Sequence, residues 1–190
     1  MATALINGDA ETGVTIFKMD EKVDHGPIIC QEKYRILLTD KRPDLEIKLT
    51  DIAFKIFKKM IRNVILSEER SDESKDPLTI KLTPQNHSLA TYTKKLLKQD
   101  GFIPFENLKL ALSEVEGLKI YNLYRGLYPW PGLWTLIQPA RPTRSNAAGQ
   151  KRLKITDLDF IDERLIIKKV KLEGKKEVDF KTFNQAYQIF

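Results

Sequence analysis

The segment from Val14 to Leu37 most constrains what this chain can fold into. Two apolar, β-branched runs, Val14 to Met19 and Ile28 to Leu37, predict two strands joined by an eight-residue polar loop. Two strands alone do not form a stable sheet. These strands therefore need further elements to pack against, and the chain has 190 residues in which to supply them.

The next segment predicts a long helix that begins near Pro43. Proline suits the first turn of a helix, and Asp44 and Glu46 complement the helix dipole there. One continuous apolar stripe recurs at three- and four-residue spacing: Leu45, Leu49, Ile52, Ala53, Ile56, Met60, Ile61 and Val64. Phe54 and Phe57 fall off the centre of this stripe. We therefore expect other structural elements to cover the helix on more than one side. These elements need not belong to this chain.

The remaining residues predict a linker and then a second, mostly β, region. Residues 67–76 have no apolar periodicity, which is typical of a linker. A helical pattern runs from Leu110 to Tyr124 and ends before Pro129. Short apolar runs then alternate with turns, as in a small antiparallel barrel. The runs are Leu133–Ile137, Leu153–Phe160 and Leu165–Leu172, followed by a turn at 173–176 and a short helix over 180–190.

Composition excludes several classes of protein. No apolar run approaches the roughly 20 residues that span a bilayer, and the N-terminus lacks the pattern of a signal peptide. We therefore expect a cytoplasmic protein without membrane contact. Cys30 is the single cysteine, which excludes an internal disulfide or a multi-cysteine zinc site and predicts a small core residue. Motifs for nucleotide hydrolysis, zinc hydrolysis and serine hydrolysis are absent, and no metal is expected.

The net charge of +6 is concentrated in the last fifty residues. Residues 141–190 carry 12 basic and 7 acidic side chains. Such a surplus indicates a polyanionic partner, nucleic acid first, or else an ordinary solvated lysine-rich face. The basic run from Arg141 to Arg152 is expected in an exposed barrel loop. Trp130, between two prolines, either stacks on a nucleobase or anchors packing at the junction of helix and barrel.

Asp24 is the first candidate for a catalytic residue. It lies in the loop between the two strands, where a carboxylate can accept a proton or orient a histidine, and Gly26 beside it would let a ligand approach the backbone. The alternative is that Asp24-His25-Gly26-Pro27 is simply a turn, because Asp, Gly and Pro are common turn residues. His25 is likewise either functional or a solvated loop histidine.

These residues resemble the methionyl-tRNA formyltransferase family. The run from Ile6 to Ile16, followed by Met19-Asp20-Glu21 and Asp24-His25-Gly26-Pro27-Ile28, is similar to the later part of the family's catalytic domain. Further segments are similar to the family's C-terminal domain: Ala90 to Lys95, Asp100-Gly101, Tyr124-Arg125, Pro129 to Gly132, Trp134-Thr135 and Leu172 to Lys176. The resemblance covers essentially the whole chain.

The resemblance implies transfer of the formyl group of 10-formyltetrahydrofolate to the amine of methionyl initiator tRNA. In this superfamily an asparagine, a histidine and an aspartate carry the reaction, and Asp24 matches the aspartate. The folate site would then be lined by Met19, Asp20, Glu21, Val23 and Asp24. The C-terminal domain would be an OB-like barrel that binds tRNA, with Arg141, Arg144, Lys151 and Arg152 as the candidate contacts.

The resemblance also implies a chain that is incomplete as an enzyme. The family's asparagine and histidine precede the matched segment, so this chain is expected to be inactive without an N-terminal half. We expect an α+β chain: residues 1–66 end a formyltransferase-type α/β sheet domain, 67–88 are a linker, and 89–190 form the OB-like domain. The alternatives are a non-catalytic basic tRNA-binding module, or a formyltransferase acting on a sugar nucleotide or a free tetrahydrofolate derivative.

Overall fold

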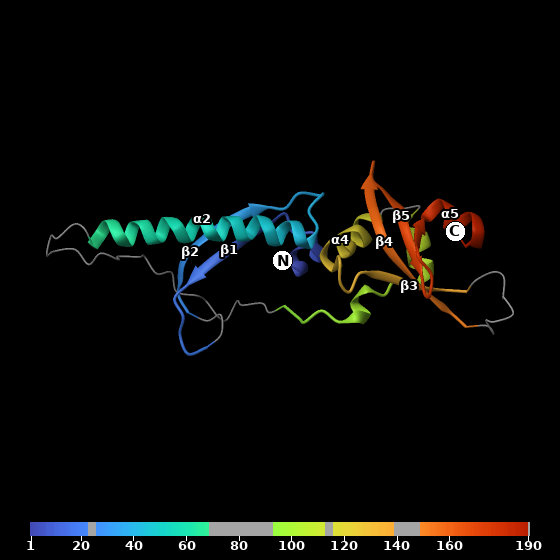
Figure 1. The fold of residues 1–190 in the computed structure, drawn as a ribbon, viewed down its shortest axis with the longest axis horizontal. Coiled ribbons are helices and arrows are strands. Elements are labelled where there is room, and N and C mark those ends of the chain that lie inside the picture. Colours follow the sequence, from blue (N-terminus) through green and yellow to red (C-terminus); the bar gives the residue numbers. More distant parts are fainter. Residues whose placement is uncertain (23–25, 69–92, 113–115, 139–148, 190) are drawn as a thin grey trace. The chain divides into compact units, whose positions relative to one another are not determined.

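A computed structural model describes residues 1–22, 26–68, 93–112, 116–138 and 149–189 (Figure 1). The described residues combine helices with two antiparallel sheets, which confirms the α+β class. In chain order the elements are α1 (Ala2–Asn7), β1 (Glu11–Phe17), β2 (Ile28–Arg35), α2 (Arg42–Glu68), the 3-10 turn η2 (Lys98–Gly101), α3 (Phe105–Ala111), α4 (Gly117–Leu127), β3 (Leu133–Ile137), β4 (Lys151–Ile161), β5 (Arg164–Leu172), β6 (Glu177–Asp179) and α5 (Phe180–Tyr187).

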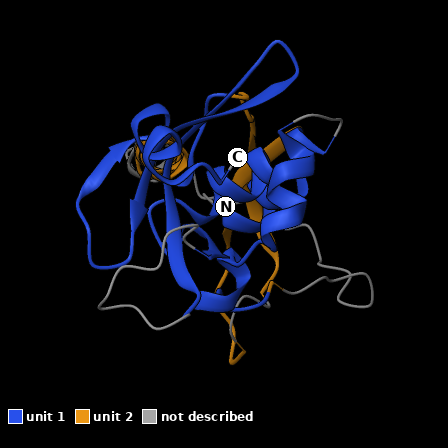
Figure 2. Cartoon of the chain, turned by 90° about the vertical axis from the view of Figure 1, so that its right-hand side faces the viewer, with its two compact units in different colours: residues 1–9, 39–42, 94–190 blue, residues 10–38, 43–93 orange. Residues whose placement is uncertain are grey.

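The chain divides into two compact units, shown in blue and orange in Figure 2. Unit 1 comprises residues 1–9, 39–42 and 94–190, and unit 2 comprises residues 10–38 and 43–93. Short N-terminal pieces thus pack with the C-terminal residues. The domain boundaries expected from the sequence, 66 and 88, stay a prediction.

Unit 2 contains the predicted strand pair and the predicted long helix. β1 and β2 form an antiparallel hairpin in which Glu11 pairs with Arg35 and Ile16 pairs with Cys30. α2 runs beside the hairpin (Figure 1), and the Sγ atom of Cys30 lies 4.0 Å from the Sδ atom of Met60. Cys30, expected as a small core residue, is partly buried in contact with α2.

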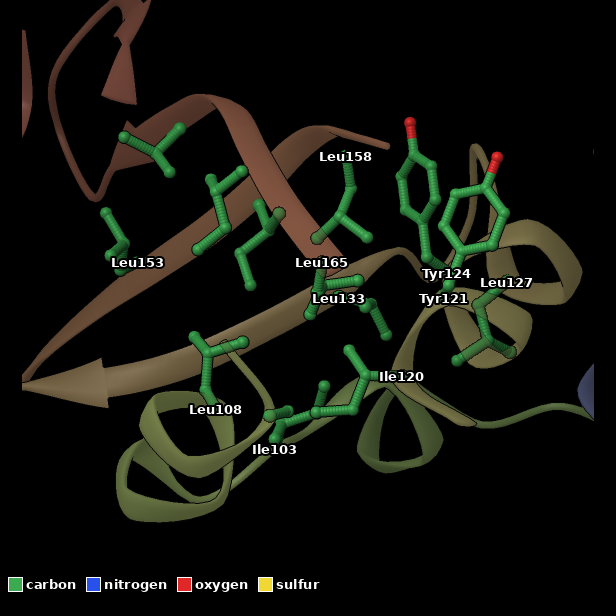
Figure 3. Close-up of a cluster of buried hydrophobic side chains, with 14 of the residues drawn as sticks. Ile103, Leu108, Ile120, Tyr121, Tyr124, Leu127, Leu133, Leu153, Leu158 and Leu165 are labelled. Atoms are coloured by element: carbon green, nitrogen blue, oxygen red, sulfur yellow. The ribbon is translucent and has the colours of Figure 1, made fainter. Parts of the chain in front are cut away.

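Unit 1 is built on a four-stranded antiparallel sheet in the order β3-β4-β5-β6. α4 contacts β3, β4 and β5, and the apolar side chains between them form one core (Figure 3). Its fully buried members include Leu108, Leu127, Leu133, Leu153, Leu158 and Val170. Among the described residues the sheet is open, so the closed OB-like barrel stays a prediction.

Two local features of unit 1 differ from the expected pattern. The single helix expected over Leu110 to Tyr124 is instead two helices, α3 and α4. Gly117 begins α4, and a Cβ atom there would lie 3.1 Å from the Ala111 carbonyl oxygen and 3.3 Å from Leu165 Cβ. The glycine therefore lets the start of α4 approach both α3 and β5.

β4 carries a bulge, because its pairing with β5 shifts on both sides of Asp157.

α1 packs closely against α4, and the sequence did not predict this short helix. Leu5 is completely buried, and α1 contacts α4 along its length. The close approach depends on Gly126, because a Cβ atom there would lie 2.6 Å from Ile6 Cγ1 and 2.8 Å from the Ala2 carbonyl oxygen. Gly126 thus serves as the contact point between the two helices.

Two side-chain contacts attach the segment 39–42 to α4. Lys41 Nζ donates a hydrogen bond to the Tyr124 hydroxyl at 3.2 Å, and the buried Arg125 donates from Nη1 to the Asp40 carbonyl oxygen at 3.2 Å. Tyr124 is only 1% exposed. Its burial and the nearby Asp157 carboxylate raise the pKa of the Tyr124 hydroxyl above the usual tyrosine range.

We predict that Gly126→Ala destabilises the protein. Alanine normally stabilises a helix interior relative to glycine by about 1 kcal/mol. Here the added methyl group overlaps α1, so the free energy of unfolding in urea should fall by about 1–3 kcal/mol. Ile6→Ala removes Cγ1 and should make the Gly126→Ala change less costly in the double variant. A Gly126→Ala chain more stable than the parent would contradict this packing.

We also predict that Tyr124→Phe changes the pH dependence of stability. The unfolded chain loses the Tyr124 proton near pH 10, whereas the folded chain keeps it to higher pH. The unfolded state then binds fewer protons, so the free energy of unfolding falls above pH 10, by up to about 1.4 kcal/mol per pH unit from this group. Urea unfolding between pH 9 and pH 11 should show the parent losing stability relative to Tyr124→Phe. A constant difference would argue against a raised pKa.

Candidate functional site

The loop that was predicted to hold the catalytic residue is closed at its base by a backbone contact. Lys18 N donates to the Pro27 carbonyl oxygen at 2.9 Å. Gly26 is buried, and a Cβ atom there would overlap the Lys18 carbonyl oxygen. The glycine is thus required by the approach of the chain to itself. The expectation that it opens the backbone to a ligand is not supported.

The described part of this loop presents exposed side chains. Met19 is 85% exposed, and Asp20 and Glu21 are exposed as well. Asp20 Oδ1 accepts a hydrogen bond from Lys22 N at 2.9 Å, which fixes the first turn of the loop. Val23, Asp24 and His25 lie outside the described residues. The roles given to Asp24 in catalysis and to this loop in folate binding therefore stay predictions.

The basic residues proposed for tRNA binding have different surroundings from those expected. Arg141 and Arg144 lie outside the described residues. Lys151 and Arg152 begin β4, so they belong to a strand and not to an exposed loop. The Arg152 guanidinium carbon lies 4.8 Å from the centre of the Trp134 ring, and the side chain is partly buried. Arg152 is thus committed to packing on Trp134.

Trp134, rather than Trp130, is the aromatic anchor of this region. Its ring lies 4.8 Å from that of Phe102, and its Nε1 donates to the Lys98 carbonyl oxygen at 3.0 Å. These contacts attach η2 to β3. Trp130 is 55% exposed, so the interpretation of Trp130 as a packing anchor is wrong.

The side of the sheet opposite the core carries a basic patch that the sequence reasoning missed. Arg152 and Lys154 alternate with the buried Leu153 and Ile155 along β4, so they face away from the core. Lys154 pairs directly with Lys171 of β5. We call Arg152, Lys154 and Lys171 the outer basic face. The period-two alternation of β4 and β5 was the signal that could have found it.

The Lys154–Lys171 pair is uncompensated by carboxylates. Within the described ranges neither lysine forms an ion pair. Like charges directly opposite each other on neighbouring strands destabilise a sheet. An anion bound at this face would remove that repulsion, so the pair is suited to binding a phosphate group.

No cluster of three or more His, Cys, Asp or Glu side chains in the described part of the chain could hold a metal ion. No helix in it is long and apolar enough to cross a membrane.

Comparison with known proteins identifies relatives of both units. Residues 1–61 match the formyl transferase family. The methionyl-tRNA formyltransferase of Kosmotoga olearia is 37% identical over 139 residues, which are 73% of this chain and 38% of that protein. A match of 139 residues is longer than the 61-residue family match, so the similarity continues past the formyl transferase segment.

Two solved structures share the fold. An N-formyltransferase from Helicobacter canadensis, in complex with folinic acid and dTDP-3-aminofucose, has a TM-score of 0.52 at 18% identity and covers 94% of this chain and 58% of that one. Methionyl-tRNA formyltransferase from Clostridium thermocellum has a TM-score of 0.50 at 16% identity, with coverage of 94% and 61%. At these identities the likeness concerns the fold alone.

The chain spans less than two fifths of the length of the curated relatives it matches, 38% and 36% for the first two. The resemblance found in the sequence is nevertheless confirmed over 73% of this chain. This chain is thus similar in sequence to methionyl-tRNA formyltransferases, and its residues 1–61 match the formyl transferase family.

Proposed function

We propose that this chain takes part in the transfer of a formyl group from 10-formyltetrahydrofolate to the amine of methionyl initiator tRNA. The observation that carries the proposal is the 37% identity to a methionyl-tRNA formyltransferase over 139 residues. Because that match extends past the 61 residues of the formyl transferase segment, it favours a tRNA substrate over a sugar nucleotide. The reaction belongs to translation initiation, in the cytoplasm.

The chemistry requires a base for the amine proton and a donor for the oxyanion. The amine attacks the formyl carbon, the carbonyl oxygen becomes an oxyanion, and a base takes the amine proton. The carbonyl then re-forms, the C–N bond to the folate breaks, and the departing folate nitrogen takes up a proton. The proposal gives Asp24 the task of orienting the histidine that acts in this proton transfer. By resemblance, that histidine and the asparagine that stabilises the oxyanion occupy positions before Ile6.

The described part of the loop is chemically suited to the folate. A pterin ring has apolar faces and a polar edge. Met19 offers an exposed thioether, a polarisable group that packs on flat rings. Asp20 and Glu21 add exposed carboxylates beside it, which can accept hydrogen bonds from ring N–H groups. In the proposal, this loop holds the donor while Asp24 faces the reacting atoms.

The tRNA is proposed to bind unit 1 through the outer basic face. Phosphate contacts dominate the affinity of nucleic-acid complexes. Lys154 and Lys171 lie opposite each other and lack carboxylate partners among the described residues. Arg141, Arg144 and Lys151 remain candidate contacts by resemblance. Closure of the sheet into an OB-like barrel is part of this proposal, and the alternative is that unit 1 binds tRNA without catalysis.

We predict that catalysis needs Asp24 together with the histidine and the asparagine that the resemblance places before the matched segment. The 190-residue chain should form no formyl-methionyl-tRNA. Fused to the preceding part of the Kosmotoga olearia enzyme it should turn over, and Asp24→Asn should then lower kcat at least about 100-fold. Glu32→Gln, an exposed change on β2, is the matched control and should have little effect. Turnover by the 190-residue chain alone, or equal effects of the two changes, would contradict the proposed role.

We predict that the outer basic face binds tRNA phosphates. Lys154→Glu with Lys171→Glu should weaken tRNA binding, and the slope of log K against log salt should become shallower by about one for each phosphate that is no longer neutralised. The matched control is Lys109→Glu with Lys181→Glu, which changes the net charge equally at exposed helical positions. Fluorescence anisotropy from about 50 mM to 200 mM salt measures both. Identical slopes for the two double variants would rule out this face.

A further inference from the structure

Trp130 is an exposed aromatic residue that the proposed function does not use. Its side chain is 55% exposed, although tryptophan is on average among the more buried residue types. Within the described ranges its ring makes no ring–ring or cation contact, and its indole N–H has no hydrogen-bond acceptor. Trp134, four residues later, makes all three kinds of contact. Trp130 therefore does not fill space in the core, and its ring is available to a ligand.

The turn that carries Trp130 is firmly attached to the rest of unit 1. Gly132 N donates to the Leu127 carbonyl oxygen at 3.0 Å, which joins the turn to the end of α4. Pro131 and Gly132 are buried. Gly101 of η2 packs on the same turn, because a Cβ atom there would overlap the Gly132 carbonyl oxygen. A backbone held in this way presents the exposed ring with little further loss of conformational entropy on binding.

A lysine of the outer basic face lies on this turn. A Cβ atom at Gly132 would be 2.8 Å from Lys154 Cε and 3.3 Å from Lys154 Nζ, so the lysine side chain crosses the turn two residues from Trp130. Lys154 pairs in turn with Lys171 of the neighbouring strand. An exposed aromatic ring and two ammonium groups therefore occur in one region of the surface of unit 1.

A nucleotide matches this combination of groups. Its base has flat faces that stack on indole rings, and its phosphate is an anion that ammonium groups bind. A neutral sugar or an apolar protein surface could cover the ring but would offer no charge to Lys154 and Lys171. The surplus of basic side chains in residues 141–190, 12 against 7 acidic, also favours a polyanion on unit 1.

We propose that Trp130 stacks on an unpaired base of a polynucleotide whose phosphates lie on Lys154 and Lys171. The inference rests on the proposed function for the identity of that polynucleotide, a tRNA, and adds the kind of nucleotide that is bound. Bases inside a duplex are covered on both faces by their neighbours, so a base stacked on Trp130 belongs to a single-stranded segment or a strand end. The ring thus selects unpaired nucleotides, which phosphate contacts alone do not.

A free nucleotide fits this site less well than a polynucleotide. Stacking of one base on an aromatic side chain strengthens binding roughly 5- to 150-fold. That factor alone corresponds to a dissociation constant in the millimolar range or weaker. Successive phosphates of one strand, bound by Lys154 and Lys171, supply the remaining affinity.

Binding of a single-stranded oligoadenylate of about ten nucleotides tests the proposal without a catalytic readout. Trp130→Leu removes the aromatic ring and should weaken binding at least about fivefold at every salt concentration from about 50 mM to 200 mM. The slope of log K against log salt should stay unchanged, because no phosphate contact is lost. Trp130→Phe keeps a ring and should bind within about threefold of the parent. Fluorescence anisotropy of the labelled oligonucleotide measures all three proteins.

Two controls separate base stacking from charge and from general effects of substitution. Leu118→Ala removes an exposed apolar side chain elsewhere in unit 1 and should change the affinity for oligoadenylate less than about twofold. Polyphosphate, a polyanion without bases, should bind the parent and Trp130→Leu equally. Equal weakening of polyphosphate and oligoadenylate binding by Trp130→Leu would overturn the proposal. Equal effects of Trp130→Leu and Leu118→Ala on oligoadenylate binding would overturn it as well.

Tryptophan fluorescence gives a second readout that a merely structural role would not change. Oligoadenylate should quench the parent, and Trp130→Phe leaves Trp134 as the single tryptophan. This variant should lose most of the quenching while it keeps its affinity, and undiminished quenching would overturn the proposal. Binding of adenosine monophosphate that depends on Trp130 and is tighter than millimolar would overturn it in favour of a free-nucleotide site.

Failure of the stacking and failure of the proposed function give different results. Oligoadenylate binding that depends on Trp130, together with a fused chain that forms no formyl-methionyl-tRNA, supports stacking and contradicts the proposed function alone. Formyl transfer by the fused chain, together with oligoadenylate and tRNA binding that Trp130→Leu leaves unchanged, overturns stacking alone.

Discussion

Burial of most of α4, from Ile120 to Leu127, organises unit 1. Ile120, Tyr121 and Leu127 are buried with the sheet's core, whereas Gly126 lies against α1 and Arg125 bonds to the segment 39–42. A helix surrounded in this way needs small residues where another backbone approaches and paired polar groups where a charge is buried. Gly126 meets the first need, and the Arg125 bonds to Asp40 and Asn122 meet the second.

The same helix explains how distant parts of the chain are joined. The chain leaves unit 1 after Asp9, forms the hairpin of unit 2, and returns to unit 1 at residues 39–42. Both points of attachment rest on α4, through α1 and through the contacts of Asp40 and Lys41. The segments that precede and follow the hairpin in the chain are therefore both packed on α4, within unit 1. That dependence explains why a boundary drawn from composition at residue 66 differs from the grouping by contact.

Sequence patterns predicted most strands and the long helix, because those elements are long enough to show their period. In β4 the buried residues are spaced by two from Leu153 to Ile155 and by three from Ile155 to Leu158. The spacing of three occurs where the bulge at Asp157 shifts the pairing with β5. α1 was missed because six residues are too few to show a helical period. Asp24 could be named from resemblance alone, since nothing local separates it from a turn. Arg152 was misplaced because a basic run does not reveal that one of its members packs on a tryptophan.

The exposed surfaces of the two units indicate different kinds of incompleteness. In unit 1 the outer basic face has a repulsive pair, Lys154 and Lys171, that an anion would relieve without any change in the fold. In unit 2 the side chains of Phe54 and Phe57 are exposed to water, and the unfavourable free energy of hydrating their rings is removed only when they are buried. A bound nucleic acid would remove the repulsion between the two lysines, and a folded protein surface would bury the two phenylalanine rings. The proposed formyl transfer to tRNA would draw on both units, because the candidate catalytic loop belongs to unit 2 and the candidate phosphate contacts belong to unit 1.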